Sequence, residues 1–248
     1  MSGGPDSRWI VPDWPATPRV RALITTRAGG VSAGRYAGLN LGTGVGDDPE
    51  HVARNRAIVR ACLPGDPLYL KQVHGIRVVD AAESAAGVEA DGAVARASGV
   101  VCAVLTADCV PLLLCDRAGS VAGVAHAGWR GLAAGLVGEI VRAMGSPPGE
   151  ILAYLGPAIG PLAYEVGEDT RRAFVDEDPG AAAAFAPGRN GKYLADLYRL
   201  ARRRLAAAGV AAVYGGGFCT VAEERFFSFR RDGVTGRMAS FVWIEGES

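Results

Sequence analysis

The sequence predicts a single domain of the α+β class, in which strands and helices mix without a strict strand–helix–strand rhythm. Three observations favour this class. The 248 residues suffice for one large hydrophobic core. Apolar residues make up 49% of the chain and charged residues 21%, as in globular proteins. Apolar runs typical of strands mix with helical periodicity, without repeats or internal linkers. We expect residues 1–18 to form a loose arm and residues 19–248 to form one catalytic domain of mixed α/β structure.

The first part of the chain predicts strands and one clearly marked helix. Asp48 followed by Pro49 is typical of a helix start, because the carboxylate caps free amides and proline fits the first turn. We expect this helix to end near Cys62, and a bend at His74 to divide the β-forming run 68–80 into two strands. The other strands expected in this part are 20–26, 100–105, 112–115, 120–125 and 151–155.

The second part predicts two helices and a hairpin. Residues 131–144 favour a helix that packs through small side chains. In residues 194–208 the apolar positions recur at the spacing of one helical face. Residues 226–244 favour a β-hairpin whose turn lies at Asp232 and Gly233.

Composition argues against several classes of protein. The chain has 26 basic and 26 acidic residues, whereas proteins that bind the nucleic-acid backbone usually carry a basic excess. The most apolar stretch, 99–115, is too short for a membrane span and is interrupted by Asp108 and Pro111. The N-terminus lacks a secretory apolar segment, and the five cysteines form no CxxC pair. We therefore expect a cytoplasmic protein with neither nucleic acid nor membrane as a partner.

Three segments place a reactive residue where a predicted strand ends or bends: 71–75 (KQVHG), 106–111 (TADCVP) and 125–131 (AHAGWRG). If His74, Cys109 and His126 converge, they form a His₂Cys set. Such a set suits tetrahedral zinc with one open position, which is typical of catalytic zinc. The spacings of 35 and 17 residues match no compact zinc motif. One buried histidine, one turn histidine and one core cysteine remain the alternative.

Further candidates have a functional and a structural interpretation each. Arg27, beside a Gly-Gly pair, could hold a phosphate or be a turn arginine. Asp108 could transfer protons or cap a strand end. Trp129 and Arg130 could stack on a flat ring or pack at a helix entry, and Asn40 could orient a substrate or serve a turn.

Segments along nearly the whole chain resemble one known family. They are TTRAGGVS (25–32), LNLG (39–42), GDDPEHVARNR (46–56), KQVHG (71–75), CAVLTADCVPLLL (102–114), VAHAGWRGL (124–132), LGPAIG (155–160), YEVG (164–167), KYLADL (192–197) and FFSFRRDGVTGRMASF (226–241). They are similar to the bacterial YfiH-like laccase-domain family, described as polyphenol oxidases, purine nucleoside phosphorylases or peptidoglycan editing factors. The resemblance implies a compact α+β fold and, in some members, homodimers.

The resemblance also implies a metal, usually zinc, held by His74, Cys109 and His126. The implied activity is phosphorolysis of adenosine, inosine and methylthioadenosine to the free base and a ribose 1-phosphate, with adenosine deamination at the same site. We add Gln72 to the candidate substrate-binding residues. The general acid stays open between three residues of family-like segments: Asp108, Glu165 and Arg230.

The histidine count bears on the alternative activity, a copper-dependent oxidation of phenols. A multicopper oxidase needs about ten histidines for its copper sites, and this chain has three. One Cu²⁺ in the His₂Cys site could still oxidise phenols, so we expect that as a side activity. Zinc suits deamination at C6 of the purine and phosphorolysis at C1′, with Arg27 holding phosphate and Asp108 moving a proton. Editing of peptidoglycan precursors is the other alternative.

Overall fold

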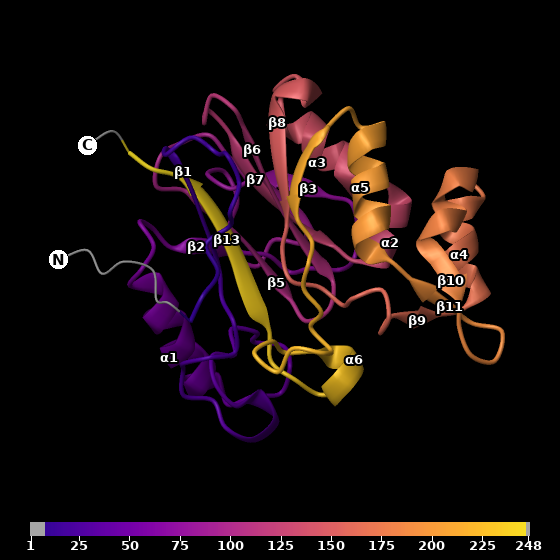
Figure 1. Ribbon diagram of the computed structural model, residues 1–248. Helices are drawn as coiled ribbons and strands as arrows, with labels where there is room; N and C mark the ends of the chain where they lie inside the picture. Colours follow the sequence, from indigo (N-terminus) through magenta and orange to yellow (C-terminus); the bar gives the residue numbers. More distant parts are fainter. Residues whose placement is uncertain (1–7, 247–248) are drawn as a thin grey trace.

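Two β-sheets packed face to face form the centre of the protein (Figure 1) in the computed structural model, which describes residues 8–246. The four-stranded sheet has the order β1 (Val20–Ile24), β13 (Met238–Ile244), β5 (Val101–Thr106) and β2 (Pro67–Tyr69). The six-stranded sheet has the order β12 (Ala212–Gly215), β8 (Ile151–Leu155), β6 (Val110–Asp116), β7 (Ala122–Ala127), β4 (Gly92–Ala95) and β3 (Val78–Asp80).

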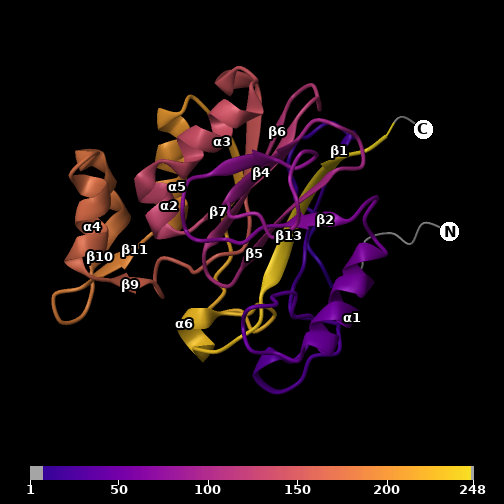
Figure 2. The ribbon, with the colours of Figure 1, turned by 180° about the vertical axis from the view of Figure 1, so that it is seen from behind.

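Helices cover the outer faces of both sheets, so the molecule has four layers (Figures 1 and 2). The six-stranded sheet is covered by α2 (Trp129–Ala134), α3 (Leu136–Met144) and α5 (Leu197–Ala207). The four-stranded sheet packs against α1 (Pro49–Arg60). None of the helices in the described part of the chain is long and apolar enough to cross a bilayer.

A smaller unit extends from one side of the body (Figure 1). It consists of a three-stranded sheet and one helix: β10 (Phe185–Pro187), β11 (Tyr193–Ala195), β9 (Glu165–Val166) and α4 (Glu168–Val175). Three short 3₁₀ helices, Gly34–Tyr36, Pro148–Glu150 and Pro179–Ala184, and the four-residue α6 (Phe229–Asp232) lie in connections.

The central strand β6 shows why the sequence contains continuous apolar runs. Successive side chains of a strand point to opposite faces. Leu112 and Leu114 pack in the core beneath the helices, whereas Leu113 and Cys115 pack between the two sheets. Both faces of β6 are therefore buried, and the run lacks the polar alternation of a half-exposed strand.

The structure confirms the mixed α/β class and most of the predicted elements. Asp48 caps α1, because its carboxylate accepts a hydrogen bond from the Glu50 amide at 2.8 Å. The bend at His74 separates β2 from β3. The helix predicted over 131–144 is divided at Gly135, whose φ of 101° interrupts the helical backbone between α2 and α3.

The hairpin predicted over 226–244 is wrong. Met238–Ile244 is a strand, but it lies between β1 and β5, and Phe229–Asp232 is the helix α6. The Ser228 hydroxyl caps this helix by accepting a hydrogen bond from the Arg231 amide at 3.2 Å. This cap, together with the burial of Phe226 and Phe227, prevails over the β-forming side chains.

The N-terminal arm predicted as loose over residues 1–18 is partly packed. Residues 1–7 lie outside the described residues. Trp9 is buried in the core of the four-stranded sheet. Ile10 exchanges two backbone hydrogen bonds of 2.8 Å with Ile24. Burial of the indole and this pairing hold the described part of the arm against the body.

Candidate metal centre and active site

The three predicted metal ligands meet at one end of the two-sheet body. One ligand atom each of His74, Cys109 and His126 lies within 4.8 Å of the others. Cys109 Sγ is 3.9 Å from His74 Nε2, and the two imidazole rings stand at 74° with centroids 4.7 Å apart. His74 is exposed, Cys109 half-buried and His126 buried, so the cluster is open to solvent on one side.

Strand register brings these distant residues together. His126 lies near the end of β7, paired with Pro111 of the antiparallel neighbour β6. Cys109 immediately precedes β6, in the turn by which the chain passes from β5 in one sheet to β6 in the other. His74 lies in the bend between β2 and β3, which belong to the same two sheets. His74 and Cys109 therefore lie where the chain crosses between the sheets, and His126 lies near the end of a strand beside them.

Asp91, which the sequence analysis did not single out, holds two of the ligands in place. Its carboxylate is fully buried directly before β4. It accepts hydrogen bonds from the amides of Val73, His74 and Gly75 at 2.7–3.1 Å. A fourth bond, of 2.8 Å, joins it to Nδ1 of His126. The sequence offered one indication of a buried role for Asp91, namely a single acidic residue among the small residues of 90–93.

The bond to Asp91 also determines how His126 can act. A carboxylate only accepts, so Nδ1 of His126 carries the proton and Nε2 keeps its lone pair for a metal. Burial raises the pKa of Asp91, but the hydrogen bonds from His126, Gly75 and Val73 outweigh it and hold that pKa below its usual value. The carboxylate thus stays charged beside the imidazole.

The thiol of Cys109 is biased toward the thiolate that metal ligation requires. Burial raises its pKa, but the charge and hydrogen bond of His126, together with those of His74, lower it to about 6. Burial lowers the pKa of His126, whereas Cys109 and Asp91 raise it to about 9. Each group thus favours the charged form of the other, and a metal ion that binds here would take the place of the proton on His126 Nε2.

The donor set fits a tetrahedral metal ion. Ligand atoms around zinc lie about 3.3–3.6 Å apart when metal–ligand bonds have their usual lengths. The 3.9 Å between Cys109 Sγ and His74 Nε2 is close to that spacing. Two imidazoles and one thiolate leave one coordination position for a substrate or water and a net charge of about +1.

Two of the site residues have a left-handed backbone, which non-glycine residues rarely adopt. The φ of His74 is 61° and that of Asp108 is 96°. Asp91 fixes the first of these. Asp108 is fixed by hydrogen bonds from Thr220 Oγ1 at 2.5 Å and from the Arg230 amide at 2.7 Å to its carboxylate. Strain maintained in this way is typical of functional sites.

Gly128 leaves no room for a side chain beside the ligands. A Cβ atom built there would lie 3.0 Å from Cys109 Sγ and 3.0 Å from His74 Cδ2. We expect Gly128→Ala to displace both ligands and to weaken metal binding about 10-fold, because ligand atoms must be held within roughly 0.5 Å. Titration with zinc in competition with a chromophoric chelator measures this affinity.

Gly138→Ala is the matched control for this prediction. Gly138 lies in α3, and a Cβ atom there meets nothing within 4 Å. We expect this variant to bind zinc as the wild type does and to be slightly more stable, since alanine favours the helix. Equal zinc affinity in the two variants would contradict the steric argument.

Two predicted substrate-binding residues make internal hydrogen bonds. Asn40 is fully buried, and its amide bonds to Gly42, Asp47 and the Arg237 amide. Gln72 bonds through both amide atoms to the backbone of Leu105, at 2.7 and 2.8 Å. These contacts hold the backbone around both residues in place, and for Asn40 they correspond to the turn role considered in the sequence analysis.

The predicted stacking pair is also engaged. The Arg130 guanidinium lies 4.6 Å from the centroid of the Trp129 ring, and Trp129 packs against the core beneath the helices. Trp129 is half-buried in these contacts, which corresponds to a packing role at the entry of α2.

Arg27 lines a surface cavity of about 310 Å³ together with Arg35, Asp232 and Val234. Its guanidinium lies 5.0 Å above the ring of Phe227, which packs with Ala107 next to Asp108. The sequence predicted Arg27 as a candidate phosphate-binding residue, but it did not predict Arg35.

Arg237 is a second cation that the sequence analysis missed. Burial is the larger effect and holds the pKa of Arg237 below its usual value, although the charges of Cys109, Asp108 and Tyr36 raise it. Arg237 thus lies within electrostatic reach both of the metal ligands and of the Gly34–Tyr36 turn that carries Arg35.

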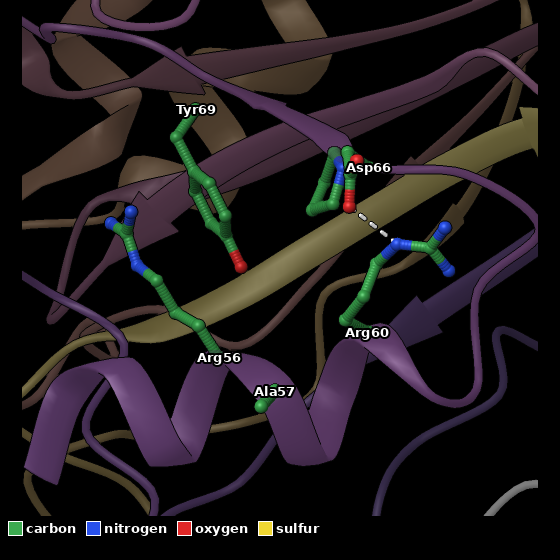
Figure 3. Close-up of a pocket in the computed structure, with 6 residues that line it drawn as sticks. Arg56, Ala57, Arg60, Asp66 and Tyr69 are labelled. Atoms are coloured by element: carbon green, nitrogen blue, oxygen red, sulfur yellow. Dashed lines mark hydrogen bonds and ion pairs between the residues drawn. The ribbon is translucent and has the colours of Figure 1, made fainter.

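A second hollow lies away from this site, between α1 and β2 (Figure 3). Its volume is about 310 Å³. Arg60 is paired with Asp66 at 2.5 Å, and the Arg56 guanidinium lies 3.8 Å over the Tyr69 ring. Its polar groups thus largely contact each other. It is lined by Arg56, Ala57, Arg60, Asp66, Pro67 and Tyr69, and none of the metal ligands contributes.

Proteins of known sequence and structure resemble this chain over nearly its whole length. The purine nucleoside phosphorylase of Pseudomonas aeruginosa is 52% identical over 239 residues, which cover 96% of this chain and 98% of that protein. The purine nucleoside phosphorylase YfiH of Escherichia coli K12 is 51% identical over 242 residues, with coverage of 96% and 99%.

Solved structures show the same fold. A crystal structure of a Neisseria meningitidis protein superposes with a TM-score of 0.93 at 54% identity and covers 97% of this chain and 100% of that one. YlmD from Geobacillus stearothermophilus gives a TM-score of 0.88 at 32% identity, with 98% of each chain covered.

The profile of one family matches residues 21–245, which include all three metal ligands and Asp91. The family description refers to several coppers, whereas two of the three histidines of this chain form one His₂Cys cluster with Cys109. By this match and by its relatives, the chain belongs to the multi-copper polyphenol oxidoreductase laccase family.

Proposed function

We propose that this protein is a zinc-dependent purine nucleoside phosphorylase that acts in the cytoplasm on adenosine, inosine and methylthioadenosine. The observation that carries the proposal is the His74–Cys109–His126 cluster, whose solvent-facing side leaves room for a ligand beside cationic side chains. The names of the relatives from Pseudomonas and Escherichia support the reaction. Five free cysteines agree with a reducing compartment.

Zinc, held by the two imidazoles and the thiolate, would act as a Lewis acid toward oxygen atoms at the site. The residues around it orient the reactants. A phosphate oxygen attacks C1′ of the ribose, the C1′–N9 bond breaks, and the base leaves with the electron pair and takes up a proton. The products are the free base and a ribose 1-phosphate.

Phosphate is assigned to the cavity of Arg27 and Arg35, and Arg237 adds a positive charge within electrostatic reach of Cys109. Guanidinium groups bind phosphate through parallel charge-assisted hydrogen bonds. Asp232 at the cavity is already paired with Arg231, so its negative charge is partly neutralised.

We assign Asp108 a positioning role in place of the proton transfer suggested by the sequence. Both of its carboxylate oxygens accept hydrogen bonds from within the protein, from Thr220 and from the Arg230 amide. The same residue accepts a backbone bond from Ile159. Asp108, which directly precedes Cys109, thus connects three loops to the metal site.

Two further activities belong to the same proposal. Adenosine deamination would use the same metal and replace the C6 amino group with oxygen from water. Oxidation of phenols is the second candidate function, favoured by a donor set that also suits Cu²⁺. Two assays compare these functions: formation of ribose 1-phosphate by zinc-loaded protein and oxidation of phenols by copper-loaded protein. Rapid phosphorolysis with slow phenol oxidation would identify the phosphorylase as the main activity.

The test measures inosine turnover by zinc-loaded protein with and without phosphate. We expect hypoxanthine and ribose 1-phosphate to form only when phosphate is present. Equal hypoxanthine formation without phosphate, or none under any condition, would overturn the phosphorylase.

Variants at the cavity test the phosphate assignment. Arg27→Ala and Arg35→Ala should each raise the KM for phosphate about 10-fold, since each removes a charge-assisted hydrogen bond worth roughly 1.5–3 kcal/mol. Arg54→Ala is the control, because Arg54 is an exposed arginine on α1. If the KM values of the two cavity variants for phosphate match that of the Arg54→Ala control, phosphate binds elsewhere.

A further inference from the structure

Phe229 is the one exposed aromatic side chain in residues 8–246. Its side chain is 58% exposed, whereas every other Phe, Tyr and Trp of this part of the chain is buried or half-buried. Exposing a phenylalanine forgoes the free energy gained by burying it. An aromatic side chain left exposed at a site rim is therefore a candidate for ligand contact.

The backbone that carries Phe229 is firmly held. Phe226 and Phe227, just before it, are fully buried. Ser228 caps α6. The Arg231 guanidinium donates to the carbonyls of Thr220 and Phe226, both at 2.8 Å. The exposed ring thus projects from a rigid element, as a preorganised binding surface requires.

One hydrogen bond connects α6 to the metal site. The Arg230 amide donates to Asp108 Oδ2 at 2.7 Å. Phe229 precedes Arg230 in the chain, and Cys109 follows Asp108, so the aromatic residue and the metal ligand flank this bond. At the other end of α6, Asp232 lines the cavity of Arg27 and Arg35. Phe229 therefore belongs to a short helix that contacts the residue before Cys109 and lines the cationic cavity at its other end.

The neighbouring side chain points to another partner and leaves the ring uncovered. The Arg230 guanidinium donates to the Glu165 carbonyl at 2.9 Å and lies 5.0 Å over the Tyr164 ring. Trp129, the other aromatic candidate, lies between the Arg130 guanidinium and the core. Phe229 thus offers the aromatic surface that Trp129 does not.

We propose that Phe229 is the surface on which the purine base of the substrate stacks, a specificity-determining contact that rests on the proposed phosphorylase function. With the base on Phe229 and phosphate at Arg27 and Arg35, the ribose lies between them, beside the metal ligands. Aromatic stacking requires a flat ring and no particular hydrogen-bonding edge, so adenine and hypoxanthine bind alike.

The test compares Phe229→Ala and Phe229→Tyr with the wild type, all loaded with zinc. Binding of inosine is measured by calorimetry without phosphate, and KM and kcat are measured with phosphate. We expect Phe229→Ala to raise the inosine Kd and KM about 10-fold. Zinc content and the KM for phosphate stay unchanged, and Phe229→Tyr restores inosine binding.

Ile58→Ala controls for the loss of an exposed apolar side chain, because Ile58 is 41% exposed on α1. An inosine Kd in Phe229→Ala equal to that of the wild type overturns the stacking proposal. So does an equal weakening by Phe229→Ala and Ile58→Ala. Wild-type protein that binds inosine without splitting it overturns the phosphorylase, and the binding comparison then decides the role of Phe229 independently.

Discussion

Replacing Cys109 with alanine is expected to lower the zinc content from about one ion per chain to nearly none and to abolish phosphorolysis. The thiolate is the one anionic ligand among the three. Its loss leaves two neutral imidazoles, and zinc sites with fewer than three protein ligands hold the metal weakly. Metal analysis after dialysis and a ribose 1-phosphate assay measure the two effects.

Cys62→Ala is the control for Cys109→Ala. Cys62 is exposed near the end of α1 and is not part of the ligand cluster. We expect this variant to keep its zinc and its activity. If Cys109→Ala still turns over inosine at the wild-type rate after its zinc has been lost, the metal plays no part in the reaction and the proposed function is wrong.

We expect Asp91→Asn to weaken zinc binding about 10- to 100-fold and to lower the free energy of unfolding by about 3 kcal/mol. Each carboxylate oxygen of Asp91 accepts two hydrogen bonds, one of them from His126. An asparagine amide nitrogen cannot accept, so two buried donors lose their partner. Where the amide nitrogen takes the place of Oδ1, His126 Nδ1 is one of these donors and its tautomer is no longer fixed.

Asp116→Asn separates the metal effect from a general loss of stability. Asp116 is also a buried carboxylate with several internal hydrogen bonds, from Ser120, Val121 and Ser146. It lies at the end of β6 opposite to Cys109. We expect this variant to lose stability in chemical unfolding but to keep its zinc affinity. Equal loss of affinity in the two variants would show that Asp91 acts on the fold alone.

Local patterns were sufficient to predict much of the fold. The Asp48 cap of α1 and the uninterrupted apolar run of β6 depend on neighbours in sequence, which a reader of the sequence can see. Residues 226–232 show where local patterns mislead. Their β-forming side chains favoured a strand, but buried Phe226 and Phe227 and the Arg231 contacts turn the chain into α6.

The three candidate ligands were predicted from their donor chemistry together with the family resemblance, whereas their surroundings were not predicted. His74, Cys109 and His126 are the kinds of residue that bind metals, and each follows or interrupts a strand. Asp91 could not be recognised, because its role depends on the pairing of β4 with β7, which brings its carboxylate to His126. Arg35 and Arg237 likewise come near the site through contacts with residues far away in the sequence.

The sequence by itself indicated the central strands and the start of α1, since these follow from side-chain periodicity and capping. It also offered His74, Cys109 and His126 as candidate ligands, a set that the family resemblance implied. The tertiary structure alone decided which polar and aromatic groups are free to act. Trp129 is half-buried against Arg130 and the core, whereas Phe229 is 58% exposed on α6. Exposure and hydrogen-bond partners depend on packing between segments far apart in the chain, which no local pattern records.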